Sequence, residues 1–330
     1  WFEHCPVRVI EFGAGSGAMA VQVLRELERL GVREVAYDIV EVSGELAARQ
    51  AERIRAECAW ALPRVRWLPA WPDQLAGVVL GNEVLDAMPV RAFRIDGGRV
   101  FERGVVVTEP REPGGAPGFA WSLREADPPF AARVRERLAE GHGMDPAVPG
   151  PYDGEIGEQA EAWVRQLGSR LVRGAALLID YGFPRREFFH AQRTGGTLMC
   201  HHRHRAHTDP FLLPGLQDIT AHVDFTAIAQ AAEASGLRTL GYVPQSRLLT
   251  NLGLADDLIA RHRDAAGDPL AWARQAQAAQ ALLSEAEMGE LFKAIALASP
   301  PLHEGLGFER GDRLASLGLG RAVVPPEAVR

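Results

Sequence analysis

The first ninety residues alternate between short apolar runs and amphipathic helices, and few folds accommodate such an alternation. Four runs are predicted as strands: residues 7–12, 35–42, 65–68 and 77–80. Between the first two, apolar residues recur at helical spacing over 23–30, and Gly31 ends the predicted helix. A second helix is predicted over 44–57, with Ser43 as its N-cap. Strands joined through helices form right-handed βαβ units, so the sequence predicts an α/β fold with a parallel sheet.

The alternation is interrupted after residue 90 and resumes near residue 157. A hairpin around Asp96–Gly98, a helix near 130–140 and two Pro/Gly-rich loops suggest an inserted cap. The later part is expected to contain a helix over 158–172, a strand over 175–181, a helix over 224–235 capped by Asp224, and a strand over 237–243. We therefore divide the chain into the first half of the main domain (1–90), a capping insertion (91–156), the second half of the main domain (157–245), a helical cap (246–289), and a last strand over 291–297 with a C-terminal tail (290–330).

Composition excludes several classes of protein. The 330 residues are 47% hydrophobic and 24% charged, which is typical of a globular chain. Lys and Arg number 36 against 43 Asp and Glu, a formal charge of −7, so no nucleic-acid partner is expected. There is no apolar run long enough for a membrane span, no secretory signal and no CxxC pair, so we expect a cytoplasmic protein. Because the sequence starts at Trp1 with a strand already at residue 7, further residues are expected upstream.

A glycine-rich loop follows the first predicted strand and opens the first helix. Glycines at Gly13, Gly15 and Gly17 let the backbone turn sharply and let a ligand approach main-chain N–H groups. Glu41 lies 24 residues past Gly17, at the end of the second strand. An acid in this place accepts hydrogen bonds from the hydroxyls of a ribose. The loop and the acid together predict a cofactor that contains a nucleoside.

Two features favour S-adenosylmethionine over NAD as this cofactor, although Gly13, Gly15 and Ala18 also fit the dinucleotide fingerprint. Glu11 places a carboxylate two residues before the first glycine, where it would attract a cationic amino-acid portion and repel a pyrophosphate. The fourth strand leads into an acidic loop, residues 81–89, which suits a sulfonium donor and a nitrogen acceptor. The remaining alternative is a glycine turn that serves only tight packing.

These residues belong to stretches in which the sequence resembles the MidA-like family of S-adenosylmethionine-dependent methyltransferases. The matching stretches, in the order of the family, are Glu11–Gly17, Ile39–Ser43 with Gln50, Gly81–Val90, Ile179–Gly182, Gly195–Leu198, Pro214–Phe225 and Met288–Leu297. The resemblance implies a Rossmann-like class I methyltransferase sheet, mostly parallel, with a capping insertion and an additional helical segment. It also implies S-adenosyl-L-methionine as the cofactor.

The same resemblance implies a substrate. Mitochondrial members of the family act in the matrix as complex I assembly factors that methylate an arginine of a complex I subunit. The expected partner is therefore a protein with an exposed arginine. Two departures bear on this expectation: the family's N-terminal Thr-Ala-Pro-Glu-like segment does not occur in this sequence, and Cys200–His204 is unusually rich in histidine.

A pair of carboxylates can hold a guanidinium bidentately, so the acidic loop is the candidate acceptor site. Glu83 and Asp86 are the candidate catalytic residues, and a helical turn would place both on one side. Asn82 is expected near the methionine portion of the donor, and Ser43 is placed with Glu41 among the cofactor-binding residues. In the alternative interpretation, Asp86 caps a helix or pairs with a surface arginine while Glu83 contacts only the cofactor.

Four further residues are candidates for substrate binding or for the reaction. Asp180 and Tyr181 end a buried strand at the edge of the sheet where ligands collect, and Tyr181 either lines the acceptor pocket or closes the core. Polar and apolar residues alternate over 218–224, so an extended segment would place Asp218 and His222 on one polar face. His222 is a candidate catalytic residue that accepts or donates a proton at the acceptor, or else a buried histidine.

No metal site is predicted, although histidines cluster between His190 and His222. A metal would be held by Cys200, His202, His204 and His207, and their spacing matches no zinc pattern. A loop that contacts the substrate or a partner, or simply a solvated loop, fits better. The absence of interleaved aromatic residues in this stretch argues against RNA.

Three functions remain in consideration. The first is a methyltransferase for a protein arginine. The second is a methyltransferase of the same fold for a small molecule or another side chain. The third is a donor-binding assembly factor with weak activity that holds a partner protein.

Overall fold

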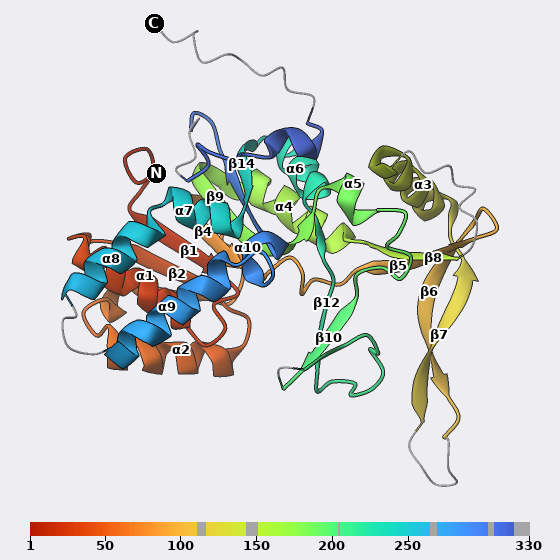
Figure 1. Ribbon diagram of the computed structural model, residues 1–330, viewed down its shortest axis with the longest axis horizontal. Coiled ribbons are helices and arrows are strands. Elements are labelled where there is room, and N and C mark those ends of the chain that lie inside the picture. Colours follow the sequence, from red (N-terminus) through yellow and green to blue (C-terminus); the bar gives the residue numbers. More distant parts are fainter. Residues whose placement is uncertain (111–116, 143–150, 204, 265–268, 303–306, 320–330) are drawn as a thin grey trace, which may run out of the picture. The chain divides into compact units, whose positions relative to one another are not determined.

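The computed structural model describes residues 1–110, 117–142, 151–203, 205–264, 269–302 and 307–319, and it divides into two compact units (Figure 1). Unit 1 comprises Trp1–Asn82, Arg165–Ile179 and Ala229–Arg330, and unit 2 comprises Glu83–Val164 and Asp180–Ile228. The five segments predicted from the sequence divide the chain differently and stay a prediction.

Unit 1 is built on seven strands of an eight-stranded sheet, in the order β14-β15-β9-β4-β1-β2-β3. Its strands are β1 (Arg8–Phe12), β2 (Ala36–Val40), β3 (Val65–Leu68), β4 (Leu75–Asn82), β9 (Leu171–Phe183, which continues into unit 2), β14 (Arg238–Pro244) and β15 (Phe292–Ala298). The pairs β1–β2, β2–β3, β1–β4 and β4–β9 are parallel, and β14–β15 is antiparallel. The α/β fold with a mostly parallel sheet is therefore confirmed.

The helices of unit 1 include the two that the sequence predicts between its first three strands. They are α1 (Ala18–Arg29), α2 (Gly44–Glu57), η1 (Leu62–Arg64), α7 (Gln245–Asn251), α8 (Leu254–Asp264), α9 (Pro269–Leu283), α10 (Met288–Leu291) and η2 (Leu314–Leu317). Ser43 caps α2 as predicted, because its Oγ accepts a hydrogen bond from the N–H of Leu46 at 3.3 Å. None of the helices in the described ranges is both long enough and apolar enough to cross a bilayer.

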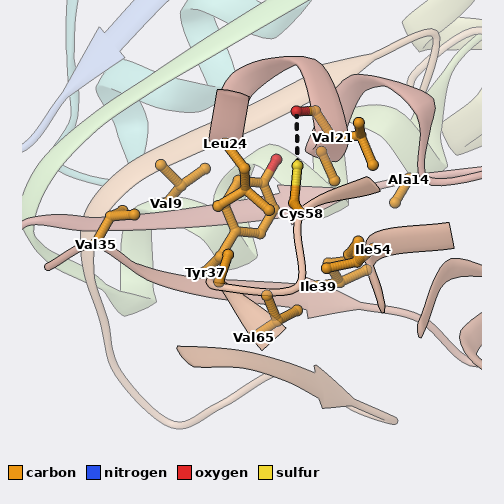
Figure 2. Close-up of a cluster of buried hydrophobic side chains, with 12 residues drawn as sticks. Val9, Ala14, Val21, Leu24, Val35, Tyr37, Ile39, Ile54, Cys58 and Val65 are labelled. Carbon is orange, nitrogen blue, oxygen red and sulfur yellow. Dashed lines mark hydrogen bonds between the residues drawn. The ribbon is translucent and has the colours of Figure 1, made fainter. Parts of the chain in front are cut away.

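A buried apolar cluster joins the first helices of unit 1 to its sheet (Figure 2). Leu24 of α1, Ile54 of α2 and Tyr37 and Ile39 of β2 are all fully buried. The cluster thus holds α1 and α2 against β1, β2 and β3. Burial of each such side chain stabilises the fold by about 1.5–3 kcal/mol, so this packing fixes the loops at the strand ends.

Unit 2 contains two antiparallel sheets. The four-stranded sheet has the order β7-β6-β5-β8 and is formed by β5 (Arg91–Asp96), β6 (Arg99–Thr108), β7 (Gly118–Glu125) and β8 (Tyr152–Ile156). The three-stranded sheet has the order β11-β10-β12 and is formed by β10 (Met199–His202), β11 (Arg205–His207) and β12 (Asp218–Thr220), while β13 (Val223–Asp224) pairs with the end of β9. The predicted hairpin is confirmed, because Gly97 and Gly98 connect β5 to β6 with positive φ angles of 54° and 75°.

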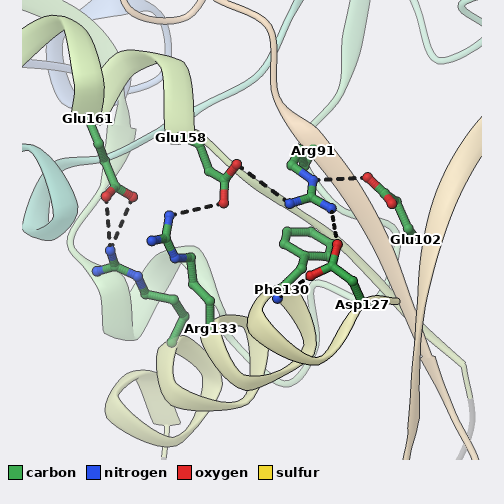
Figure 3. A network of polar contacts seen from close by, with 8 residues as sticks. Arg91, Glu102, Asp127, Phe130, Arg133, Glu158 and Glu161 are labelled. Atoms are coloured by element: carbon green, nitrogen blue, oxygen red, sulfur yellow. Dashed lines mark hydrogen bonds and ion pairs between the residues drawn. The ribbon is translucent and has the colours of Figure 1, made fainter. Parts of the chain in front are cut away.

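Polar contacts link the larger sheet of unit 2 to the start of a helix (Figure 3). The helices of this unit are α3 (Pro128–His142) and α5 (Arg185–Phe188), together with the first turns of α4 (Glu158–Arg170) and α6 (Phe225–Ala234), which both end in unit 1. Arg91 of β5 bonds to Glu102 at 2.9 Å and to Asp127 at 3.1 Å, and it lies over the ring of Phe130 at 3.7 Å. Asp127 also caps α3, so one arginine links two strands to a helix start.

Two helices end or break where the sequence pattern did not show it. The helix predicted over 158–172 ends at Arg170, because β9 begins at Leu171, which pairs with Leu75 of β4. The helical segment over 246–289 is divided among α7, α8, α9 and α10. Asp224 caps α6 as predicted, with its Oδ1 accepting from the N–H of Ala227 at 3.1 Å.

Candidate functional site

The predicted cofactor residues gather at one edge of the parallel sheet in unit 1. β4, β1 and β2 are neighbours and run parallel, so their carboxyl ends lie at the same edge. The residues that follow or end these strands are Gly13, Gly15 and Gly17 after β1, Glu41 and Ser43 after β2, and Asn82 at the end of β4. This is the edge where open α/β sheets bind ligands.

The glycine loop requires glycine because of its backbone angles. Gly13, Gly15 and Gly17 have positive φ angles of 69°, 50° and 75°, which other residues rarely adopt. A Cβ at Gly15 would meet nothing within 4 Å, so the space beside this residue is open. Gly17 is the N-cap of α1, where the first N–H groups of the helix have no partner within the helix itself. The loop therefore offers backbone donors to a ligand.

Glu11 lies in β1, two residues before the loop, and its side chain is fully buried. One carboxyl oxygen accepts a hydrogen bond from the Tyr37 hydroxyl at 2.7 Å, and the other has no partner among the described residues. Burial raises the pKa of Glu11 to about 7, against the lowering effect of the Tyr37 bond. A buried carboxyl with one unpaired oxygen is suited to a cationic ligand, because the ligand would satisfy the oxygen and favour the ionised form.

Gln50 of α2 links the acid after β2 to the glycine loop. Its Nε2 donates to Glu41 Oε2 at 3.0 Å and to the carbonyl oxygen of Gly15 at 2.9 Å, while its Oε1 accepts from Trp67 Nε1 at 3.0 Å. The other oxygen of Glu41 accepts from the N–H of Ser43 at 2.9 Å. Glu41 is thus held in one orientation beside the loop.

No chemical role was predicted for Gln50 from the sequence, where it is only part of a stretch that carries the family resemblance. Gln50 and Ile54 are the fully buried residues of α2, whereas Leu46 and Ala47 are only partly buried. The sequence signal that could have indicated this role is the position of Gln50, a polar residue at the helical spacing of the apolar residues of α2.

In unit 2, Asp180 organises the acidic loop that follows β4. Its side chain is buried, and its Oδ2 accepts the N–H groups of Val84, Leu85 and Asp86 at 3.1, 2.8 and 3.3 Å. Glu83, which opens the loop, is exposed and has a positive φ of 51°, a strained conformation for a residue other than glycine. The carboxylate predicted to bind substrate therefore holds backbone in this structure, and substrate binding by Asp180 stays a prediction.

The structure does not place Glu83 and Asp86 on one side of a helical turn. Glu83 is exposed whereas Asp86 is 3% exposed, and the segment forms a single turn closed by the Met88 N–H and the Leu85 carbonyl. The N–H groups of Val84, Leu85 and Asp86 bond to Asp180 rather than to carbonyl groups of a preceding helical turn. A bidentate carboxylate pair is therefore not present in this arrangement.

Asp86 instead belongs to a group with Tyr181 and His222. Burial raises the pKa of Asp86, while a hydrogen bond from the Tyr181 hydroxyl opposes this and the charge of Asp218 adds to it. The His222 ring lies edge-on to the rings of Tyr181 and Phe183, with centroids 5.4 and 5.3 Å apart. Two candidate catalytic residues and one candidate acceptor residue are thus brought together.

The segment over 218–224 is not one continuous strand, because β12 ends at Thr220 and β13 begins at Val223, and the shared polar face of Asp218 and His222 stays a prediction. Asp218 and Ile219 are both exposed, whereas Thr220 is buried, because β12 ends at Thr220 and the N–H of Ala221 turns to bond the carbonyl of Asp86 at 3.0 Å. Asp218 lies on the exposed part of β12, where it acts on Asp86 through its charge.

No group of three His, Cys, Asp or Glu side chains in the described ranges could hold a metal ion. Cys200 and His207 lie opposite each other in the β10–β11 hairpin, and Cys200 is buried. His204, the remaining residue of the metal alternative, lies outside the described residues.

Comparisons with known proteins bear on this site. A family model described as S-adenosyl-L-methionine-dependent methyltransferase matches residues 2–243. A crystal structure of an uncharacterized protein from Burkholderia thailandensis is 46% identical, covers 94% of this chain and 78% of that one, and has a TM-score of 0.83. A second structure from this organism, solved with S-adenosyl-homocysteine bound, is 46% identical with a TM-score of 0.82 and covers 94% of this chain and 76% of its own.

The chain is also similar to proteins named protein arginine methyltransferase NDUFAF7, mitochondrial. The Danio rerio protein is 27% identical over 87% of this chain, and the Rattus norvegicus protein is 26% identical over 88%. The chain spans about two thirds of their length, 68% and 66% respectively.

Proposed function

Because the chain belongs to this family of S-adenosyl-L-methionine-dependent methyltransferases, of MidA-like type, we propose that it methylates an arginine side chain of a protein. The family establishes the methyltransferase fold and the use of S-adenosyl-L-methionine. The arginine acceptor is the finer step, and the observation that carries it is the similarity, over most of this chain, to proteins named protein arginine methyltransferases. By the same similarity we propose a subunit of respiratory complex I as the acceptor protein.

The residues of unit 1 fit S-adenosyl-L-methionine. The unpaired oxygen of Glu11 is suited to its ammonium group, the loop over 13–17 to close backbone approach, and the fixed carboxylate of Glu41 to its ribose hydroxyls. Ser43, which follows β2, and Asn82, at the end of β4, are the other two candidate donor-binding residues. When bound, the donor supplies a methyl group on a positively charged sulfur, which is already activated for displacement.

The chain's own task is to place the acceptor nitrogen, exclude water and remove a proton. Alignment of two reactants contributes about 7–11 kcal/mol to such a reaction. Exposed Glu83 is positioned for binding a guanidinium from solvent, and it follows donor residue Asn82 directly in the chain. Asp86, whose pKa burial raises, accepts a proton more readily than an ordinary aspartate, and His222 is the second candidate for this step.

We place the reaction in the bacterial cytoplasm, with a protein bearing an exposed arginine as the partner. The relatives with this activity in their names are mitochondrial by name. The exposure of Glu83 favours a macromolecular acceptor over a small molecule enclosed in a pocket.

The experiment that tests the proposal identifies the acceptor directly. The protein is incubated with methyl-labelled donor and a lysate from cells that lack it, and labelled peptides are sequenced by mass spectrometry. Methylarginine in a defined protein is the expected result. Label on another side chain or on a small molecule would contradict the arginine proposal. Donor binding by calorimetry without any transfer would favour the assembly-factor alternative.

A further inference from the structure

The stretch Gly195–Leu198, one of those that carry the family resemblance, lies in unit 2 beside β8. The N–H of Asp153 donates to the carbonyl of Thr194 at 2.9 Å, and Asp153 and Gly195 form an isolated parallel bridge. Neither the donor residues nor the acidic loop explains why this stretch contains two glycines and a threonine.

Glu155 of β8 accounts for two residues of this stretch, Gly196 and Thr197. Its side chain is 1% exposed, and its Oε2 accepts hydrogen bonds from both the N–H and the Oγ of Thr197, each at 2.9 Å. Gly196 has a positive φ of 75°, and a Cβ there would overlap the Glu155 carboxyl. Glycine at 196 and a carboxylate at 155 therefore fit each other.

Thr197 connects Glu155 to His222, the candidate catalytic histidine. Its Oγ accepts a hydrogen bond from the backbone N–H of His222 at 3.1 Å. A threonine hydroxyl has a single hydrogen, and because this hydrogen is donated to Glu155, a lone pair is left to face His222. The preceding N–H, that of Ala221, donates to the carbonyl of Asp86 at 3.0 Å. Two successive amides of the segment are thereby anchored.

We propose that Glu155 and Thr197 are positioning residues that fix His222 beside Tyr181 and Asp86. This inference rests on the proposed function in one respect, namely that His222 acts on the acceptor. Glu155 and His222 also line the same small cavity of about 20 Å³ in unit 2. Burial raises the pKa of the Glu155 carboxyl, whereas the two hydrogen bonds from Thr197 oppose this shift by stabilising the ionised form, so the carboxylate and the bridge to His222 support each other.

The test compares Thr197→Val, which removes the hydroxyl at nearly constant volume, with Thr197→Ser, which keeps it. Thr226→Val is the matched control, because Thr226 is also a buried threonine of unit 2 whose Oγ accepts a backbone N–H, that of Arg185 at 3.0 Å. Hydrogen exchange of the His222 amide, followed by NMR on the whole chain, should be at least about 10-fold faster in Thr197→Val. Thr197→Ser and Thr226→Val should stay near the wild-type rate.

Unchanged exchange in Thr197→Val, or equal acceleration in Thr226→Val, would overturn the proposal. A second measurement uses the arginine acceptor: Thr197→Val should lower kcat at least about 10-fold with little change in KM, and Thr197→Ser should restore it. Faster exchange with unchanged kcat would show that the bridge has no positioning role in the reaction. If no arginine acceptor exists, the proposed function fails, but the exchange rates still decide whether the bridge holds His222.

Discussion

The protonation of Glu11 responds both to folding and to a cationic ligand. Its carboxyl is fully buried, and burial raises its pKa from the ordinary 4.5 to about 7. Because the folded pKa is the higher one, folding favours the protonated form. The stability from this group is therefore fully present below about pH 4.5 and is lost as the pH rises through about 7. A bound cationic donor would oppose the raised pKa of Glu11, because its positive charge favours the ionised carboxylate.

The free energy of unfolding of the donor-free protein should accordingly fall as the pH rises. The part of this fall that comes from Glu11 should be absent in Glu11→Gln. From this group we expect a fall of about 2–3 kcal/mol in the free energy of unfolding between about pH 5 and pH 8. Urea unfolding of wild type and variant across this range measures the difference. Glu45→Gln, at an exposed position of α2, should follow the wild type. Parallel curves for wild type and Glu11→Gln would contradict the buried-acid interpretation.

Glu41 is the second acid whose role can be measured directly. Glu41→Ala should weaken donor binding by about 10- to 100-fold, because a hydrogen bond to a charged group contributes about 1.5–3 kcal/mol. Calorimetric titration with S-adenosyl-homocysteine measures the change. Glu45→Ala, four residues further along the chain, should bind as the wild type does. An unchanged affinity of Glu41→Ala would remove Glu41 from the ribose contacts.

At the scale of elements, the loop after β4 depends on one carboxylate from β9. Asp180→Ala would leave the N–H groups of Val84, Leu85 and Asp86 without their acceptor. We expect a loss of at least about 2 kcal/mol in the free energy of unfolding by urea titration. Asp218→Ala, an exposed aspartate of the same unit, should change it by less than about 0.5 kcal/mol. Equal effects of the two substitutions would mean that the loop is held by other contacts.

The elements themselves were largely predictable, because strands, helices and caps follow from local periodicity. Ser43 and Asp224 cap helices as predicted, and the loop after β1 has the angles that its glycines indicated. The links between elements were not predictable. Gln50, Asp180 and Glu155 each bond to residues at least nine positions away in the sequence. No local pattern distinguishes such a residue from a surface or core position before the fold brings its partner near.

At the scale of the whole molecule, the excess negative charge is concentrated in unit 2. Residues 83–164 and 180–228 contain 14 Arg and no Lys against 20 Asp and Glu, so this unit carries six of the seven excess negative charges. It is also the unit that holds Glu83, Asp86 and His222. An acidic unit attracts a basic protein over distances comparable to the Debye length, about 10 Å at 0.1 M salt.

The proposed acceptor should therefore bind more weakly as salt rises. For a peptide with an acceptor arginine flanked by further Arg or Lys, KM should increase several-fold between about 0.05 and 0.5 M KCl, because screening removes the long-range attraction. A peptide that keeps the acceptor arginine but has alanine at the flanking positions serves as the control and should show a smaller change. Steady-state methyl transfer at saturating donor measures both. Equal salt dependence for the two peptides would show that the acidic surplus of unit 2 does not take part in acceptor recognition.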